Sequence, residues 1–228
     1  MFNRWEFTKW MHSAVLMLLL VVSGSAFAEV GVASSAAKES VSESEAGGVA
    51  QTPHQLVESV TNQLLQAIET HRDTFDDDPE QFFSALDTLL RDVVDFDWIA
   101  YKVMGSYGKK ATAEQRSRFA NAFRCELIET YGRGLVAYGE QNIVVLPPKE
   151  DINGQRKVKV VQEIHGSDGV FPLVYSMGLT KEGKWKVTNV VINGINLGKT
   201  FRNQFVQRAK KFGGDIDQVI SNWSSSAG

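Results

Sequence analysis

The side chains that most often perform chemistry are few in this sequence and widely spaced. Beyond the first 50 residues it has three histidines, His54, His71 and His165, in unlike sequence contexts. Their spacing matches no zinc motif, because zinc ligands usually come in pairs a few residues apart. No glycine-rich phosphate loop, Gly-x-Ser-x-Gly elbow or paired cysteine motif occurs. We therefore predict no catalytic residue, no metal site and no cofactor.

One arrangement could still support acid–base chemistry. Asp97 could act as a base beside a tyrosine, Tyr101, Tyr131 or Tyr175, in the apolar pocket of a nuclear-transport-factor-like fold. Burial would raise the pKa of such an aspartic acid toward a useful range. However, Asp97 also stands where a helix is expected to begin, and an aspartate there usually caps the helix. We favour capping and keep the enzyme as the alternative hypothesis.

Cys125 is the single cysteine, so no internal disulfide can form. It lies between Arg124 and Glu126 in a helical pattern. We interpret it as a buried apolar residue, since free cysteine is among the most buried residue types. Exported eukaryotic domains usually carry several disulfides, so a chain of this size without one favours a bacterial periplasm.

The N-terminus predicts that the chain is exported. A basic start precedes an uninterrupted apolar run, 14–22, and the small residues Ala26 and Ala28 stand where a signal peptidase reads. The run is too short for a stable membrane anchor. We predict a cleavable signal peptide over residues 1–28. No cysteine for lipid attachment follows it, so we expect a soluble periplasmic protein.

Residues 29–52 are rich in Ala, Ser, Glu and Gly and contain no aromatic residue. Such a composition cannot bury enough apolar surface to fold, so we predict a disordered leader. The whole chain has a formal net charge of −3, and the leader holds four glutamates against one lysine. The remaining residues, 53–228, are nearly neutral and carry no long basic cluster. We therefore expect no nucleic-acid partner.

Apolar residues at helical spacing predict helices at both ends of the folded part. The predicted helices are 53–71, 79–93, 96–105 and 112–138, followed by two more after Asn193-Gly194 that Gly213-Gly214 separates. Polar residues at their first positions predict N-terminal caps, which are Thr52, Asp78, Asp97, Thr112 and Asp215. Three of these have a glutamine three residues later and predict capping boxes, namely Asp78 with Gln81, Thr112 with Gln115, and Asp215 with Gln218.

Between the helices the sequence changes to short segments rich in Val and Ile. These predict strands at 142–146, 157–164, 171–179 and 184–192. Val158, Val160 and Ile164 share one face of the second strand. Because the links are short, the strands should pair with antiparallel neighbours. We predict one α+β domain over residues 53–228, with N-terminal helices, an antiparallel meander sheet of about four to five strands, and C-terminal helices.

The helices and strands carry more apolar residues than the surface needs, with 13 Phe and 5 Met in the chain. A filled core explains this pattern, and so does an apolar cavity between the helices and the sheet that holds a ligand. Periodicity cannot separate the two, because both use the same residue types. On the pattern alone, the filled core is the simpler interpretation.

An ordered set of motifs changes that balance. It consists of Val94-Asp95-Phe96-Asp97-Trp98-Ile99-Ala100, Val103-Met104-Gly105, Ala111-Thr112-Ala113-Glu114-Gln115-Arg116, Gly183-Lys184-Trp185-Lys186-Val187 and Phe201-Arg202-Asn203-Gln204-Phe205. In this order they resemble the toluene-tolerance family, that of the MlaC proteins, over roughly 53–222. The resemblance implies a soluble periplasmic carrier that holds phospholipid acyl chains in a deep apolar pocket. It also implies exchange of lipid, as cargo and not cofactor, with an inner-membrane ABC transporter complex and an outer-membrane lipoprotein complex.

Within that interpretation, we predict lipid contacts from the inward sheet face and the helices that face it. The predicted lipid-binding residues are Ile99, Val103, Phe123, Leu127, Tyr131, Val160, Tyr175, Met177, Val187, Val190, Leu197, Phe201 and Phe205.

A third hypothesis is a non-transporting interaction module of the cell envelope. Basic residues at Lys109, Lys110, Arg208, Lys210 and Lys211 could then dock acidic partners or lipid headgroups, although such residues usually form solvated surface.

Overall fold

The computed structural model describes residues 51–136, 142–166 and 169–223. The helices are α2 (Pro53–His71), α3 (Pro79–Val93), α4 (Phe96–Val103), α5 (Tyr107–Lys110), α6 (Ala113–Val136), α7 (Leu197–Lys211) and α8 (Ile216–Ser221), with a 3₁₀ turn at Arg72–Thr74. The strands are β1 (Asn142–Val145), β2 (Lys157–Gly166), β3 (Gly169–Leu179), β4 (Trp185–Ile192) and β5 (Ile195–Asn196). The predicted signal peptide and residues 29–50 of the predicted leader lie outside the described residues, as do the last two residues predicted for the helix at 112–138.

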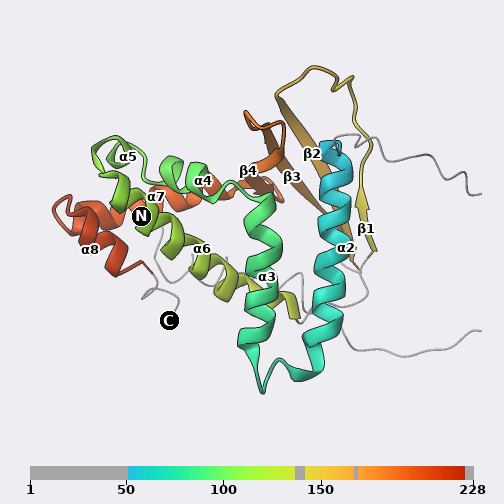
Figure 1. Ribbon diagram of the computed structural model, residues 1–228, viewed down its shortest axis with the longest axis horizontal. Coiled ribbons are helices and arrows are strands. Elements are labelled where there is room, and N and C mark those ends of the chain that lie inside the picture. The colour runs from blue at the N-terminus through green and yellow to red at the C-terminus, as the bar shows by residue number, and fades with distance from the viewer. Residues whose placement is uncertain (1–50, 137–141, 167–168, 224–228) are drawn as a thin grey trace, which may run out of the picture.

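The order of the elements confirms the predicted α+β class. Five strands form one sheet in the order β1-β2-β3-β4-β5, and each strand pairs with antiparallel neighbours. α2 and α3 stand next to each other beside the sheet, α4, α5 and α8 lie on the other side of α3, and α6 and α7 run from that group toward α2 and β4 (Figure 1). The sheet is therefore a meander with helices from both ends of the chain packed beside it.

The short strand β5 follows a tight turn at Asn193-Gly194, where the sequence predicted only the boundary before a helix. Asn193 and Gly194 both have positive φ angles, 47° and 83°. Two such residues form the tight turn that two-residue hairpins favour. They return the chain onto β4, where Ile192 pairs with Ile195, before α7 begins at Leu197.

The helix caps confirm some predictions and correct two. Thr52 and Thr112 each accept a hydrogen bond from the backbone N–H three residues on, and Asp215 does the same. The cap of α4 is Asp95, which accepts from the N–H of Trp98, and Asp97 lies inside the first turn. The prediction of Asp97 was therefore wrong by two residues. Asp78 makes no capping bond to the backbone, because its carboxylate instead accepts from the side chain of Gln81.

The prediction that Cys125 is buried was wrong. Cys125 is exposed on α6, while Phe123 and Ile128 of the same helix are buried. A helix turns by about 100° per residue, so a residue two positions from a buried one faces away from the core. Its neighbours in the sequence, both charged, lie on the half-buried flanks.

The largest apolar cluster, here the helical core, joins the helices on the far side of α3. Its buried members are Ala100, Val103, Met104, Ala111, Phe119, Ala120, Phe123, Phe201, Phe205, Ala209, Ile216, Val219, Ile220 and Trp223. Aromatic rings meet edge to face in its centre, where Phe119 lies 4.8 Å from Phe205 and 4.9 Å from Trp223 between ring centroids. Trp223, which follows the last helix, thus fixes α8 to α6 and α7.

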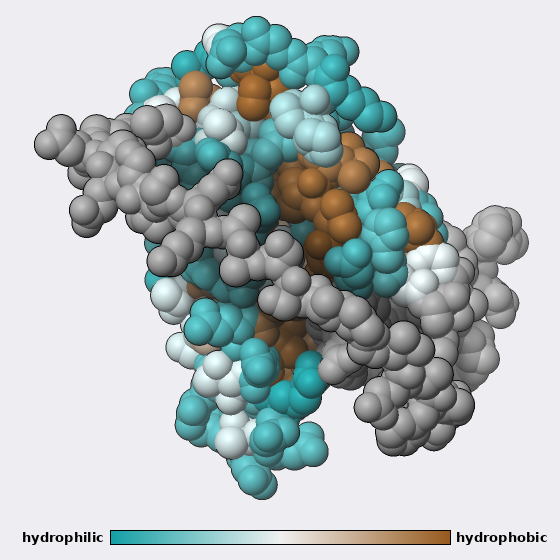
Figure 2. Space-filling view, turned by 90° about the vertical axis from the view of Figure 1, so that its right-hand side faces the viewer, coloured by the Kyte–Doolittle hydropathy of each residue, from teal (hydrophilic) through white to brown (hydrophobic). Residues whose placement is uncertain are grey.

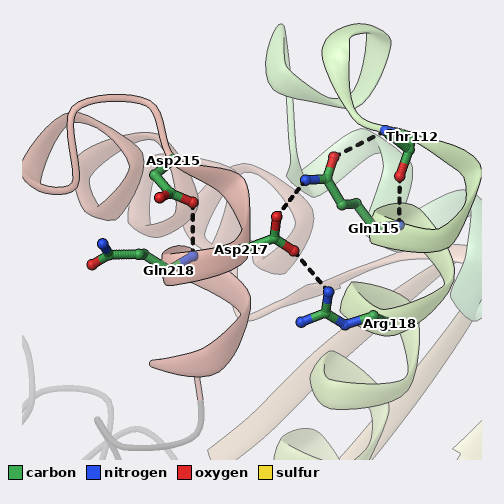
Figure 3. A network of polar contacts seen from close by, with 6 residues as sticks. All are labelled: Thr112, Gln115, Arg118, Asp215, Asp217 and Gln218. Carbon is green, nitrogen blue, oxygen red and sulfur yellow. Dashed lines mark hydrogen bonds and ion pairs between the residues drawn. The ribbon is translucent and has the colours of Figure 1, made fainter.

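Polar contacts support the same junction at the surface. Asp217 of α8 accepts from Gln115 at 2.8 Å and pairs with Arg118 at 2.7 Å, both of α6 (Figure 3). Gln115 also closes the capping box with Thr112, so the start of α6 and the start of α8 are bonded to each other. Because Arg118 and Asp217 are about half exposed, this network orients the helices more than it stabilises them.

Two smaller clusters lie along α2, one against each half of the helix. The sheet-side core contains Val57, Val93, Val158, Val160, Met177 and Val187, with half-buried Leu56, Val60, Tyr175 and Val190 against it. The hairpin core contains Ile68, Phe82, Phe83, Leu86 and Ile128, with half-buried Leu64, Leu65, Leu135, Val136 and Ile143 against it. α2 therefore contributes its first half to the sheet and its second half to α3 and α6.

A half-buried carboxylate borders the helical core. Burial raises the pKa of Glu126 from its ordinary 4.5 to about 7, because the charged form loses water; Glu129 adds to the shift. Arg208 and a hydrogen bond from the Trp223 side chain act in the opposite direction. Glu126 in turn contributes, after burial, to the raised pKa of Tyr131, about 12.

We predict that Trp223→Ala strongly destabilises the protein. Trp223 is 1% exposed, and removing so large a buried side chain typically costs about 3–5 kcal/mol. Urea unfolding followed by far-UV circular dichroism measures this loss. The matched control is Trp98→Ala, since Trp98 is 45% exposed and its loss should cost less than about 1 kcal/mol. Equal losses at the two sites would contradict the assigned core.

We predict that Glu126 makes the protein less stable as the pH rises. Its folded-state pKa lies above the unfolded value, so the folded protein binds the proton more tightly between about pH 4.5 and 7. The free energy of unfolding should fall through this window, and Glu126→Gln should flatten the fall and be more stable than the unmodified protein at pH 8. Thermal unfolding from pH 5 to 8 measures both, with Glu114→Gln, a change at an exposed glutamate of the same helix, as control. A parallel pH dependence in the protein and Glu126→Gln would contradict the prediction.

Candidate functional site

The structure places the predicted lipid-binding residues in two of the three clusters. Eight belong to or pack on the helical core, namely Ile99, Val103, Phe123, Leu127, Tyr131, Leu197, Phe201 and Phe205. Five belong to or pack on the sheet-side core, namely Val160, Tyr175, Met177, Val187 and Val190. Their role as lipid contacts remains a prediction.

Burial divides these residues further. Val103, Val160 and Phe205 have no exposed surface, and Phe123 and Met177 are 1% exposed. The rings of Phe123 and Phe201 lie edge to face, 5.1 Å apart between centroids. Such side chains already have protein neighbours on every side. The half-buried members, Ile99, Leu127, Tyr131, Tyr175, Val190 and Leu197, retain apolar surface that another group could cover.

A chain of partly buried hydrogen bonds crosses from the sheet to α2. Tyr175 donates from its hydroxyl to Gln162 Oε1 at 2.7 Å, and Gln162 donates from Nε2 to Thr61 Oγ1 at 2.7 Å. Thr61 completes the chain by donating to the carbonyl of Val57 at 2.8 Å. Burial raises the pKa of Tyr175 well above its ordinary value, so the phenol stays neutral and remains a donor.

Gln162 was missed as a site residue, although its position could have revealed it. It is 3% exposed and lies on the same strand face as Val158, Val160 and Ile164. A polar residue on the apolar face of an alternating strand must find a partner inside the protein. The alternation therefore predicts a buried polar contact for Gln162, but it cannot name Thr61, which is 101 residues away.

Apolar side chains surround this chain of hydrogen bonds from Tyr175 to Thr61, which we call the polar chain. Leu56 and Val60 of α2 pack toward the sheet-side core on one side of Thr61, and Leu64 and Leu65 pack toward the hairpin core on the other. Seen from the side of α2 and β1, a patch of apolar residues lies among hydrophilic residues in the upper half of the molecule (Figure 2). The arrangement offers apolar contacts and one fixed polar group, which suits an amphiphilic ligand better than an ionic one.

The described residues also form a polar groove. A groove of about 260 Å³ lies where α3 meets α4, α6 and β4, and its lining includes Arg91, Asp95, Asp97, Arg124 and Lys186. Beside the groove the start of α4 is joined to β4, because Val94 bridges to Val187 and the backbone N–H of Asp95 donates to the carbonyl of Val187 at 2.9 Å. This groove is distinct from the apolar cavity predicted between the helices and the sheet, which stays a prediction.

Asp97 lacks the surroundings that its hypothetical role as a base beside a tyrosine requires. Asp97 is exposed in the polar groove, so it lacks the apolar surroundings on which the hypothesis depends. Tyr131 packs on the helical core, and the hydroxyl of Tyr175 is bonded to Gln162. The half-buried carboxylate that sequence reasoning missed is Glu126, which lies against Trp223 and Arg208.

The part of the chain that the structure describes shows no cluster of three or more His, Cys, Asp or Glu that could hold a metal ion. In the same residues, none of the helices has the length and apolarity needed to cross a bilayer.

Comparison with known proteins gives a consistent result. The family model described as MlaC protein matches residues 58–225. Toluene tolerance protein ttg2D of Pseudomonas putida is 39% identical over 177 residues, which cover 77% of this chain and 81% of that protein. The intermembrane phospholipid transport system binding protein MlaC of Haemophilus influenzae is 29% identical over 181 residues, covering 77% and 82%.

A solved structure agrees in fold. The phospholipid-binding protein of Ralstonia solanacearum, determined in complex with a phospholipid, matches with a TM-score of 0.68. The match covers 76% of this chain and 97% of that one at 23% sequence identity. Since the family model covers most of the chain and a relative is 39% identical across most of its own length, the chain belongs to the MlaC family.

Proposed function

We propose that this protein is a periplasmic carrier that binds phospholipid acyl chains and shuttles lipid between inner-membrane and outer-membrane complexes. The observation that carries the proposal is the match to the MlaC family over residues 58–225. The name of the Haemophilus relative includes intermembrane phospholipid transport, and the Ralstonia neighbour was solved with a phospholipid. The proposed partners are an inner-membrane ABC transporter complex and an outer-membrane lipoprotein complex.

The physical task explains why such a protein needs apolar side chains and no reactive group. Each methylene exposed to water costs about 0.8 kcal/mol, so the two acyl chains of a phospholipid cannot cross an aqueous space unprotected. A carrier removes that cost by burying the chains while the headgroup stays in water. No bond is made or broken in this task, so the proposed protein is not an enzyme and uses no cofactor.

The half-buried apolar residues next to the polar chain are the proposed acyl contacts. Tyr175 and Val190 face each other across β3 and β4 and pack on the sheet-side core. Leu56 and Val60 of α2 pack on the same core from the helix side. Side chains that keep free apolar surface at a helix–sheet boundary can exchange water for lipid without losing an existing protein contact.

The enzyme alternative has less support than the carrier. It requires a buried carboxylate beside a tyrosine in the pocket, and Asp97 is exposed in the polar groove instead. An interaction module that does not carry lipid would also have to explain why its family relatives are named for phospholipid transport and toluene tolerance. The carrier accounts for the family, the apolar clusters and the predicted signal peptide together.

We predict that protein purified without detergent contains phospholipid. Organic extraction followed by mass spectrometry should detect phospholipid, and lipid-free protein should take phospholipid from vesicles. The uptake assay needs no other lipid acceptor, because the protein itself takes up the phospholipid. Absence of lipid after purification, together with no uptake from vesicles, would overturn the carrier.

We predict that Val190→Arg removes bound phospholipid. Val190 is opposite Tyr175 on the inward face of β4, and an unpaired charge there should lower lipid occupancy by at least about tenfold. The matched control is Val191→Arg, because Val191 is opposite Val174 and points to the other face of the sheet. Mass spectrometry of extracted lipid measures both, with circular dichroism to verify folding. Equal lipid content in two folded variants would exclude Val190 from the pocket.

A further inference from the structure

The charge of the described residues is divided between two regions of the fold. The segment from α2 through α3, residues 53–93, has nine acidic residues and two basic ones. α7 has five basic residues, Lys199, Arg202, Arg208, Lys210 and Lys211, and no acidic residue. A chain with a small net charge therefore has a strongly acidic hairpin and a strongly basic helix.

The basic region extends beyond α7. Lys102 on α4 and Lys109 and Lys110 on α5 are exposed, and α4, α5 and α7 lie together on the side of the molecule away from β1 (Figure 1). Arg202 of α7 lies close to Gly105, which follows α4, since a Cβ atom placed on Gly105 would lie 3.1 Å from Arg202 Nε. The guanidinium of Arg202 thus lies against the end of α4, close to the turn that carries Lys102.

An exposed aromatic residue stands beside one of these cations, Lys102. Trp98 is 45% exposed, and the ammonium of Lys102 lies 4.2 Å from the centroid of its ring. Tyr101 lies next to it, with ring centroids 6.2 Å apart. We call the exposed residues Trp98, Lys102, Lys109, Lys110, Lys199 and Arg202 the basic aromatic face. Arg208 does not belong to it, since Arg208 contacts Trp223.

The composition of the face indicates its partner. Tryptophan and lysine are amphipathic side chains that place an apolar body at the level of lipid headgroups and keep their polar ends in water. Clusters of Lys and Arg are attracted to membranes that contain anionic lipids. The acidic hairpin would be repelled by the same surface, so the charge separation would also orient the molecule.

We propose that the basic aromatic face binds directly to the surface of anionic phospholipid membranes, with Trp98 at headgroup level. This contact is separate from the proposed acyl-chain pocket. It gives a lipid carrier a second, weaker means of staying near a membrane, beside its protein partners. The binding is reversible because it depends on charge, which salt screens.

Sedimentation with vesicles of phosphatidylglycerol and phosphatidylcholine, against vesicles of phosphatidylcholine alone, tests the proposal. The purified protein should bind the anionic vesicles more tightly and lose most of that binding in 1 M salt, where the screening length is about 3 Å. Lys102→Glu with Arg202→Glu should weaken binding by at least roughly fivefold for each positive charge removed. Trp98→Ala should weaken it without changing the response to salt.

The control is Lys181→Glu with Lys184→Glu, which makes the same change of charge at two exposed lysines of the turn between β3 and β4. It should bind anionic vesicles several-fold more tightly than the double variant of the face. Equal loss in the two double variants would overturn the proposal, because it would show a response to net charge alone. Absence of binding to anionic vesicles would also overturn it and would favour an acidic protein as the occupant of the face.

The lipid content of each variant separates this proposal from the carrier function. Phospholipid extracted from the face variants should equal that of the unmodified protein, because none of their side chains lies among the proposed acyl contacts. If vesicle binding falls while lipid content is unchanged, the face is a docking surface. If lipid content falls in parallel with vesicle binding, the residues belong to the lipid site and the separate docking surface is wrong.

Discussion

The structure depends on one amphipathic helix that must be covered from two sides. α2 packs Val57 and its neighbours on the sheet and Ile68 and its neighbours on α3 and α6. Neither surface alone would bury it, and a single helix of this length is barely stable in water without such packing. The sheet and the helices are therefore held in one arrangement by the helix between them, and the bonded chain from Thr61 to Tyr175 fixes its register on the sheet.

Much of this fold could be predicted from local patterns. Thr52 and Thr112 were recognised as caps because the chemistry lies within four residues, and the strands were recognised from alternation and β-branched residues. Errors arose where two local signals competed. Asp95 and Asp97 both stand near the start of an apolar helix, and either could cap it. Asp95 is the cap because the backbone is held at Val94 by its bridge to β4, so the helix begins directly after Asp95. Asn193-Gly194 suits both a hairpin and a helix boundary, and here it is the hairpin.

The site was less accessible to sequence reasoning than the fold. Periodicity identified which side chains face inward, but it could not distinguish filled core from side chains that keep free surface. Phe205 packs against Trp223, whereas Val190 keeps free surface. That division depends on contacts between residues far apart in the chain, as does the pairing of Gln162 with Thr61. The exposure of Cys125 and the half-burial of Glu126 reflect a different limit, because a rotation of about 100° between adjacent helix residues decides which of them faces the core.

Three small cores in place of one large core suit the proposed task. The helical core is closed by its own aromatic contacts around Trp223, so its stability does not require the sheet-side core to be filled. Regions of a protein can open with different free energies, so the sheet-side core can open while the helical core stays packed. A carrier that must accept and release cargo benefits from this division. The helices that stay packed also include α4 and α7, which carry the basic aromatic face, so docking at a membrane and loading of lipid can proceed without one disturbing the other.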